Sequence, residues 1–398
     1  MKNTIIDHRI NCTEIVTAIR AALPKDTKPI ALHEPWFVGN ERSYLEECVE
    51  TGWVSSVGKF VDRLEQLLAE YTGATRAVAV SNGTSALHLS LKLADVQPGD
   101  EVLVPALTFV ATANAVAYCG ATPHFVDSSE ATLGICPAKL ERYLTDIADV
   151  NNGTCFNRLT SARIAAVVPM HTFGFPIDLD GLTGVCERFS IPMVEDAAES
   201  LGSFYKGKHT GTFGKIGALS FNGNKIITTG GGGAILTDDP ELGMKAKHLS
   251  TTARQPHRWT FVHDAVGYNY RMPNLNAALG CAQLEQLPRI LRHKRSLAER
   301  YQRALAECQG VRVMAEPSGT SSNYWLNCLL VESGNAGDRD LLLATTNDGG
   351  IMTRPVWKLM HTLPMYESCP RMDLSVAERF EASIVNLPSS AFLDCGNE

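Results

Sequence analysis

A lysine and a run of glycines share the segment GALSFNGNKIITTGGGGAILTDD, residues 217–239. Lys225 is flanked by apolar and small residues, and no acid is nearer to it in the sequence than Asp238. A lysine in such company is usually a surface residue whose stem packs on apolar neighbours. The alternative is a buried amine, because burial lowers the pKa of an amine and exposes the nucleophilic lone pair that a Schiff base needs. The four glycines at 230–233 would then supply a tight turn in which a side chain would clash.

The spacing around this lysine excludes two familiar phosphate-binding motifs. A P-loop has its glycines before a Lys-Ser or Lys-Thr pair, whereas Asn224 and Ile226 flank Lys225 and the glycines follow it. A dinucleotide fingerprint opens a helix, whereas Gly230–Gly233 leads into AILTDD, which has the pattern of a strand. A Schiff base remains as the chemistry for a buried lysine, and pyridoxal phosphate is the cofactor that uses one.

Pyridoxal phosphate requires two further sites, and the sequence offers a candidate for each. The segment AVAVSNGTSALHLSLKL reads as a strand, a turn with Gly83 and Thr84, and a helix whose N-terminus suits a phosphate. Any capped helix has hydroxyl residues there, so this feature is weak by itself. A carboxylate must also meet the ring nitrogen, and Asp196 ends the apolar strand IPMV. Asp196 as a simple helix cap is the alternative.

Short apolar runs alternate with helical patterns up to about residue 250. The expected strands lie at 77–80, 101–105, 122–127, 164–170 and 191–196. Such alternation predicts βα units and a mostly parallel sheet, in which ligands sit at the carboxyl ends of the strands. Thr84, His171 and Asp196 fall at those ends.

The pattern divides the chain into an N-terminal extension (1–28), a large cofactor-binding domain (29–255) and a small C-terminal domain with a connecting helix (256–398). In the extension we expect a helix at 13–23. In the small domain we expect a long helix at 276–306, broken near Pro288 because proline removes a helical hydrogen bond.

Composition limits the classes of function. A net charge of −7 over 398 residues argues against binding to nucleic acid or to a membrane surface, which needs a basic field. No apolar run could span a bilayer and the N-terminus lacks a signal-peptide pattern, so we expect a cytoplasmic protein. The eleven cysteines include no Cys-x-x-Cys pair, which indicates reduced thiols and no metal site.

Six segments together resemble one enzyme family. They are GWVSSVGKFVDRLE, AVSNGTSALHLSL, DEVLVPALTFVATANAV, VEDAAESLGS, GALSFNGNKIITTGGGG and GYNYRMPNLNAALGCAQLEQL. The chain resembles the sugar aminotransferases of the DegT/DnrJ/EryC1/StrS family, pyridoxal-phosphate enzymes of fold type I, from about Pro29 to its C-terminus. The resemblance implies an α/β fold, with a mostly parallel sheet of the seven-stranded type in the large domain and a smaller C-terminal α+β domain.

The resemblance also implies roles for residues that bind pyridoxal 5′-phosphate. Lys225 would be the catalytic lysine, Asp196 would pair with the ring nitrogen and Phe109 would stack on the ring. The residues expected at the phosphate are Gly83, Thr84 and Ser220, joined by Asn269 from the neighbouring subunit of a homodimer with shared active sites. Glu199 departs from the Gln or His that the family usually has beside the 3-hydroxyl group of the cofactor, which leaves its role open.

The implied reaction has two halves. An amino donor, glutamate in most of the family, leaves as 2-oxoglutarate, and the amino group then passes to a keto sugar. The run from 250 to 280 is most similar to enzymes that aminate C4 of UDP-linked 4-keto-6-deoxy-N-acetylhexosamines, in legionaminic-acid and bacillosamine pathways. Alternatives are amination at C3, a sugar dehydratase of the same family, and a ligand-binding pseudoenzyme. A dehydratase would have histidine in place of Lys225, and a pseudoenzyme should have lost a cofactor residue.

Basic and aromatic residues are the candidates for holding the nucleotide sugar. Arginine suits a diphosphate because it donates paired, charge-assisted hydrogen bonds. The expected substrate contacts are Trp53, His171, Arg254, His257, Arg258, Arg354, Trp357 and His361. A solvated surface loop is the alternative for the cluster at 254–258, and a packing role is the alternative for Trp357.

Overall fold

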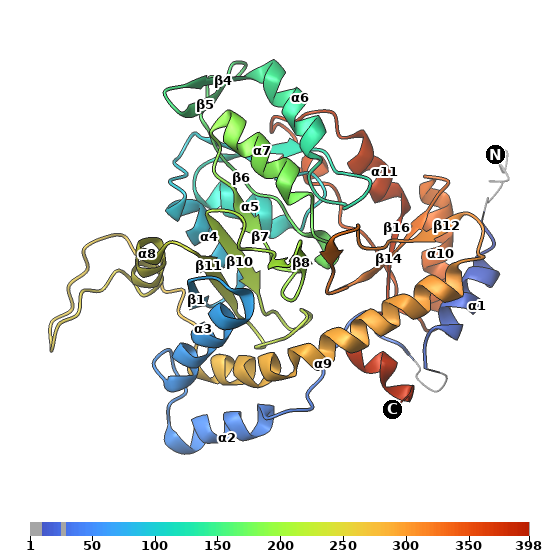
Figure 1. The fold of residues 1–398 in the computed structure, drawn as a ribbon, viewed down its shortest axis with the longest axis horizontal. Helices are drawn as coiled ribbons and strands as arrows, with labels where there is room; N and C mark the ends of the chain where they lie inside the picture. The colour runs from blue at the N-terminus through green and yellow to red at the C-terminus, as the bar shows by residue number, and fades with distance from the viewer. Residues whose placement is uncertain (1–9, 25–28, 398) are drawn as a thin grey trace.

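A seven-stranded sheet forms the centre of the structure, a computed structural model that describes residues 10–24 and 29–397 (Figure 1). Two hydrogen-bonded groups, β1-β11-β10-β7 and β3-β2-β6, meet where isolated parallel bridges join Val167 to Met193 and Met170 to Asp196. The strands are β1 (Arg76–Val80), β2 (Glu101–Pro105), β3 (Thr122–Val126), β6 (Ile164–Val167), β7 (Val194–Asp196), β10 (Ile216–Ser220) and β11 (Gly233–Thr237). Only β11 runs against its neighbours within this sheet, so the prediction of a mostly parallel sheet is confirmed.

Helices cover both faces of this sheet because its strands are apolar on both sides. On β1, Val78 and Val80 join the core formed with α4, while Ala77 and Ala79 join the core formed with α3 and α9. This alternation follows from the two-residue period of a strand. The helices of this part are α2 (Glu41–Thr51), α3 (Lys59–Thr72), α4 (Gly83–Leu93), α5 (Val110–Tyr118), α6 (Pro137–Ile147), α7 (Leu179–Phe189) and α8 (Pro240–Ser250).

A second, antiparallel sheet lies in the C-terminal part. Its order is β12-β14-β16-β15, and α10 and α11 pack against it, as the expected α+β region requires. Its elements are β12 (Val311–Val313), β14 (Asn327–Val331), α10 (Ala336–Asp348), β15 (Arg354–Pro355), α11 (Ser375–Ser383) and β16 (Ile384–Leu387). The proposed boundary between residues 255 and 256 stays a prediction.

Short elements complete the described part. They are β4 (Ala148–Asn151), β5 (Thr154–Asn157), η1 (Thr172–Gly174), β8 (Phe204–Tyr205), β9 (Lys208–His209), β13 (Thr320–Ser321), η2 (Met360–Thr362) and η3 (Ala391–Asn397).

The long helix α9 (Asn274–Leu305) connects the two sheets and corrects one prediction. It continues through Pro288, so the expected break there is wrong. Side chains on both sides of the proline, such as Leu287 and Ile290, are buried in the core shared with α3, and this packing outweighs the lost hydrogen bond.

The N-terminal extension contributes to a core as well as preceding the large domain. Its helix α1 (Cys12–Ala21) buries Ile15 and Ile19 against Leu297 and Tyr301 of α9. The expected helix at 13–23 is therefore present with slightly shifted ends. Residues 1–9 and 25–28 of the proposed extension lie outside the described residues.

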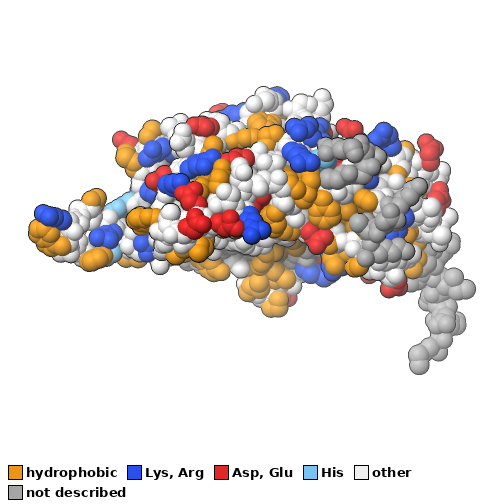
Figure 2. Space-filling model, turned by 90° about the horizontal axis from the view of Figure 1, so that it is seen from below, with side chains coloured by type: hydrophobic (Ala, Val, Ile, Leu, Met, Phe, Trp, Pro, Cys, Tyr) orange, Lys and Arg blue, Asp and Glu red, His pale blue; other side chains and the backbone are white. Residues whose placement is uncertain are grey.

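An arm formed by residues 251–268 reaches away from the body of the protein beside α8 (Figure 1). Isolated antiparallel bridges, including the one between Arg254 and His263, hold its two sides together. Trp259 and Phe261 on the arm are each 70% exposed. Figure 2 shows hydrophobic and basic side chains together on this projection.

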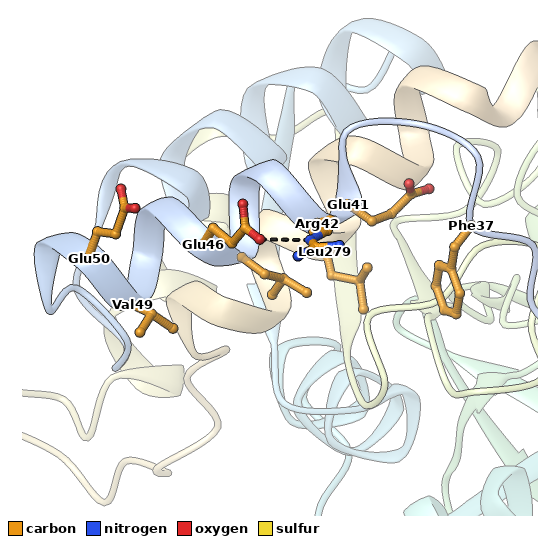
Figure 3. A pocket seen from close by; sticks show the side chains of 8 residues that line it. Phe37, Glu41, Arg42, Glu46, Val49, Glu50 and Leu279 are labelled. Atoms are coloured by element: carbon orange, nitrogen blue, oxygen red, sulfur yellow. Dashed lines mark hydrogen bonds and ion pairs between the residues drawn. The ribbon is translucent and has the colours of Figure 1, made fainter.

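A second exposed apolar surface is a groove between α2 and α9 (Figure 3). Phe37, Val49 and Leu279 provide apolar lining in this groove of about 550 Å³. An ion pair between Arg42 and Glu46 lies beside it on α2.

The described residues lack a membrane-spanning helix, a metal-binding cluster and a disulfide. No helix among them is long and apolar enough to cross a membrane. They contain no group of His, Cys, Asp and Glu side chains that could hold a metal ion. The ten cysteines whose side chains are described are all free thiols.

Candidate active site

A cavity of about 330 Å³ opens at the carboxyl ends of the central strands. Most of the residues expected at the cofactor line it together, although they come from separate strands and loops. These residues are Gly83, Thr84, Phe109, Asp196, Glu199, Ser220 and Lys225. The cavity also contains residues that sequence reasoning missed: Asn82, Leu87, Ala111, Met170, Ala198, Asn222, Asn224 and Trp325.

The N-terminus of α4 forms one end of this cavity. Asn82 caps the helix by accepting a hydrogen bond of 2.7 Å from the N–H of Ser85. Gly83 is required because a Cβ atom there would lie 2.7 Å from Cβ of Ser220. The first N–H groups of a helix carry partial positive charge and lack helical partners, so this end of the cavity suits an anion such as a phosphate.

The glycine run lets β11 enter the sheet beside this helix. Gly230 has a φ of +77°, in the left-handed region that glycine tolerates. A Cβ atom on Gly233 would lie 2.7 Å from backbone atoms of both Asn82 and Leu219. Gly231 differs, because the nearest atom to a Cβ there is 4.0 Å away. The expected clash therefore applies to part of the run only.

Asp196 lies at the end of β7 with its carboxylate buried in the cavity wall. Oδ2 accepts a hydrogen bond of 2.7 Å from the hydroxyl of Thr112, and Oδ1 accepts one of 3.1 Å from the N–H of Ala198. Burial raises the pKa of Asp196, and these two hydrogen bonds oppose the rise. Sequence reasoning missed Thr112, because its contact with Asp196 spans 84 residues of the sequence.

Lys225 follows β10 and places its amine in the same cavity, with its side chain 12% exposed. The sequence suggested a cation without an acidic partner, and the structure corrects this. Nζ lies 3.2 Å from Oε1 of Glu199, a residue that is distant in sequence. The lysine is thus largely but not fully buried, and it forms an ion pair.

Glu199 combines full burial with this ion pair. Burial raises the pKa of Glu199 to about 7, although Lys225 and the N–H of Phe173 oppose the rise. That N–H donates a hydrogen bond of 2.9 Å to Oε2, and Phe173 has a φ of +57°, a strained value for a residue with a side chain. The carboxyl group of Glu199 can therefore change charge near neutral pH.

Aromatic rings form another side of the cavity. Phe109 is partly exposed there, and its ring centre lies 6.1 Å from that of Trp357. Trp325 and Trp357 also line a neighbouring cavity of about 470 Å³, which contains Arg354. Two of the expected substrate residues, Arg354 and Trp357, are thus beside the cofactor residues.

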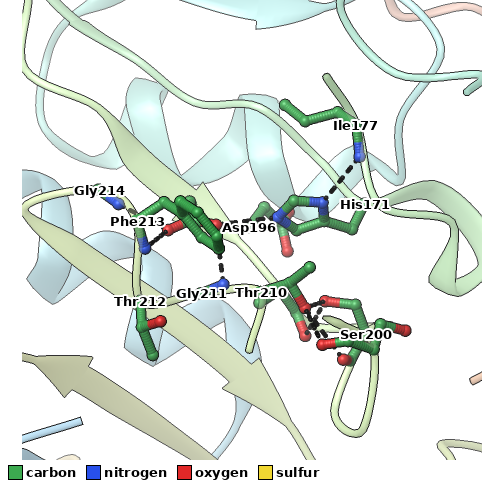
Figure 4. Close-up of polar contacts among 12 residues, drawn as sticks. His171, Ile177, Asp196, Ser200, Thr210, Gly211, Thr212, Phe213 and Gly214 are labelled. Atoms are coloured by element: carbon green, nitrogen blue, oxygen red, sulfur yellow. Dashed lines mark hydrogen bonds and ion pairs between the residues drawn. The ribbon is translucent and has the colours of Figure 1, made fainter. Parts of the chain in front are cut away.

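His171 is placed differently from its expected role in substrate binding (Figure 4). Its side chain is fully buried and donates from Nε2 to Glu195 at 3.0 Å, while Nδ1 accepts from the N–H of Ile177. Burial alone would raise the pKa of Glu195, but hydrogen bonds from His171 and from the backbone of 211–214 hold it below the usual value. His171 therefore supports the strand that carries Asp196 and does not line the cavity.

The remaining expected residues also lie outside the cavity of their own chain. They are Trp53, Arg254, His257, Arg258, Asn269 and His361. Arg254 stacks on Phe261 within the arm, with its guanidinium carbon 4.0 Å from the ring centre. Asn269 is exposed and accepts a hydrogen bond from Arg271. The expectation that the cluster at 254–258 flanks the cofactor site is not met within one chain.

The chemistry of the lining residues fits pyridoxal 5′-phosphate. An amine, a buried carboxylate, an exposed aromatic ring and a helix N-terminus match the aldehyde, ring nitrogen, ring face and phosphate of this cofactor. Gly83 also brings the start of α4 close to Ser220, so the helix N-terminus and a hydroxyl group line the same end of the cavity.

Comparisons with known proteins agree with this fit. Residues 37–395 match the DegT/DnrJ/EryC1/StrS aminotransferase family. The chain is 38% identical to a GDP-perosamine synthase of Caulobacter vibrioides, over 92% of this chain and 95% of the relative. It is 37% identical to a GDP-perosamine synthase of Escherichia coli O157:H7, over 91% of this chain and 93% of that relative. The crystal structure of the aminotransferase TlmJ from Streptoalloteichus hindustanus superposes with a TM-score of 0.81 at 31% identity, over 90% and 93% of the two chains.

Proposed function

Because the chain belongs to the DegT/DnrJ/EryC1/StrS aminotransferase family, and is thus a sugar aminotransferase that uses pyridoxal 5′-phosphate, we propose that Lys225 is the lysine that bonds the cofactor. The observation that carries this proposal is the placement of Lys225, Asp196 and the N-terminus of α4 around the same cavity. The cofactor supplies an electron sink for charge that develops on the carbon next to the transferred nitrogen.

The residues expected at the cofactor would then have separate tasks. The carboxylate of Asp196, oriented by Thr112, would keep the ring nitrogen protonated. Gly83, Thr84 and Ser220 would hold the phosphate, and Phe109 would cover the ring. These contacts fix the cofactor, so the reacting atoms meet without a search for orientation.

The amine of Lys225 would also move protons during the reaction. When it is not bonded to the cofactor, Nζ can take a proton from the donor and return it to the acceptor, because it is already within the cavity. Glu199 lies 3.2 Å from Nζ and can change charge near neutral pH, so its ionised form can pair with the ammonium group that Nζ becomes when it takes up the proton. This gives Glu199 a role different from that of the Gln or His that usually stands there.

For the substrates, we propose an amino acid donor, glutamate, and a nucleotide-linked 4-keto-6-deoxy sugar that is aminated at C4. The motif run from 250 to 280 favours a UDP-linked N-acetylhexosamine. The names of two relatives, both GDP-perosamine synthases, favour GDP as the carrier. A comparison of the two keto sugars with the purified enzyme decides between these carriers.

We also propose that the enzyme works as a homodimer with shared sites. The arm carries Arg254 and Arg258 beside two exposed aromatic rings, yet neither arginine lines the cofactor cavity or its neighbour in the same chain. Exposed apolar surface of this kind usually marks a contact with another protein. In a dimer, the arm and Asn269 would complete the phosphate and diphosphate contacts of the partner, and the groove of Figure 3 offers further apolar surface.

The test of the core proposal is spectroscopic. Purified wild-type protein with pyridoxal 5′-phosphate should show the visible absorbance of a lysine-bound cofactor, and glutamate should bleach it. Lys225→Ala should fold, lose that absorbance and lose transamination by several orders of magnitude. Lys245→Ala is the matched control, since Lys245 is exposed on α8. Near wild-type absorbance and turnover in Lys225→Ala would refute the proposal.

A further inference from the structure

Trp325 contacts the amine of Lys225 from the side of the antiparallel sheet. Nζ of Lys225 lies 4.1 Å from the centre of the Trp325 ring, a distance at which the ring face attracts a cationic amine. The ring lines the cavity, and only 4% of Trp325 is exposed. None of the proposed cofactor contacts involves Trp325.

Trp325 is held rigidly, because each of its polar groups has a partner. Its backbone N–H donates to Oδ1 of Asn323 at 2.8 Å, and its carbonyl accepts from the buried amine of Lys294 at 3.0 Å. Its indole Nε1–H donates to the carbonyl of Asn224 at 2.6 Å, the residue just before Lys225. The indole thus contacts the amine of Lys225 and the backbone of the residue before it.

The same segment reaches the other partner of the amine. The side-chain N–H groups of Asn323 donate to the carbonyls of Glu199 and Leu201, each at 2.9 Å. Glu199 lies 3.2 Å from Nζ of Lys225. Residues 323–325 therefore supply the ring beside the amine and anchor the backbone of Glu199, whose carboxylate is the other partner of the amine.

We propose that Trp325 is a positioning residue that keeps the free amine of Lys225 directed into the cavity. A lysine side chain has four rotatable bonds, so an unsupported amine would sample many conformations. A fixed ring face beside a fixed carboxylate restricts that sampling and keeps Nζ within reach of its target. This inference rests on the proposed function of Lys225.

The experiment compares two cofactor forms on apoprotein. Pyridoxal 5′-phosphate has an aldehyde that must capture the amine, whereas pyridoxamine 5′-phosphate has none and needs only the other contacts. In Trp325→Leu, we expect the rate of the absorbance rise with pyridoxal 5′-phosphate to fall by about tenfold. The affinity for pyridoxamine 5′-phosphate, measured by fluorescence or calorimetry, should change less than about twofold, since Trp325 is assigned no contact with the cofactor.

Two further variants complete the design. Trp325→Phe keeps a ring face but loses the N–H bond to Asn224, so its capture rate should fall between wild type and Trp325→Leu. If Trp325→Leu does not fold, the capture rate of Trp325→Phe tests the inference by itself. Trp36→Leu is the control, because Trp36 also lies beside a cation, Arg289 at 4.8 Å, but lines neither cavity.

The possible outcomes distinguish a failure of the inference about Trp325 from a failure of the proposed role of Lys225. Unchanged capture in the folded Trp325 variants overturns the inference, and so does a parallel loss of affinity for pyridoxamine 5′-phosphate, which would indicate general damage to the site. Capture at the wild-type rate by Lys225→Ala would instead overturn the role of Lys225.

Discussion

The amine of Lys225 lies 3.2 Å from a carboxylate oxygen of Glu199, so the candidate catalytic lysine forms an ion pair with a buried acid. Glu199 is fully buried, and burial raises its pKa to about 7. The charge of this pair therefore depends on pH within the range in which most enzymes work.

Glu199 should make the stability of the apoprotein depend on pH. Between its ordinary pKa of 4.5 and about 7, the folded state binds a proton at Glu199 that the unfolded state has released, so this contribution to the free energy of unfolding falls as pH rises. From pH 5 to 7.5 the loss should be about 2–3 kcal/mol. Denaturant unfolding at several pH values should show this loss in the wild-type protein and not in Glu199→Gln. Equal pH dependence in both proteins would contradict the prediction.

Thr112 should affect turnover through its hydrogen bond to Asp196. Its hydroxyl donates to Oδ2 of Asp196 and lowers the pKa of that carboxyl group, so Thr112→Val should favour the neutral acid. Losing a hydrogen bond to a charged group costs about 1.5–3 kcal/mol, so turnover should fall by about tenfold or more. Thr112→Ser keeps the hydroxyl and should retain most activity. Full activity in the valine variant would mean that this hydrogen bond does not tune Asp196.

The glycine run should tolerate alanine unevenly. A Cβ atom on Gly233 meets backbone atoms of Asn82 and Leu219 at 2.7 Å, and backbone cannot move aside easily. Gly233→Ala should therefore cost about 1–3 kcal/mol or more in the free energy of unfolding and weaken cofactor binding at α4. Gly231→Ala has open space and should change stability by less than about 1 kcal/mol. Urea unfolding of both variants measures the difference, and equal losses would refute this reading.

A subunit-mixing experiment should test the shared site. Lys225→Ala and Asn269→Ala each remove one residue of the proposed shared site, and Asn269 lines neither the cofactor cavity nor its neighbour in its own chain. After subunit exchange, a mixed dimer should contain one site with both residues intact, which is about a quarter of all sites at equal mixing. Transamination activity should recover toward the same fraction of the wild-type activity. If exchange is confirmed by native mass spectrometry and activity does not recover, each site is built from one chain.

Local patterns in the sequence predicted much of the fold and part of the site. The strand expected at 101–105 has the bounds of β2, and the turn at Gly83 opens α4 as expected. These features depend on side-chain period and capping, which act between residues close in the chain. Lys225 and Asp196 could be proposed in the same way, since each stands next to an apolar strand.

The tertiary structure decided how those residues meet. The break expected at Pro288 is absent because packing against distant elements outweighs a local preference. Thr112 contacts Asp196 across 84 residues of sequence, and Trp325 contacts Asn224 across 101. The periodicity of nearby side chains cannot predict such a contact, because the contact depends on which strands become neighbours in the sheet. The sequence thus determined which groups could do the chemistry. The packing of the sheets determined that the amine of Lys225 contacts both Glu199 and Trp325, since only folding brings those segments within contact distance.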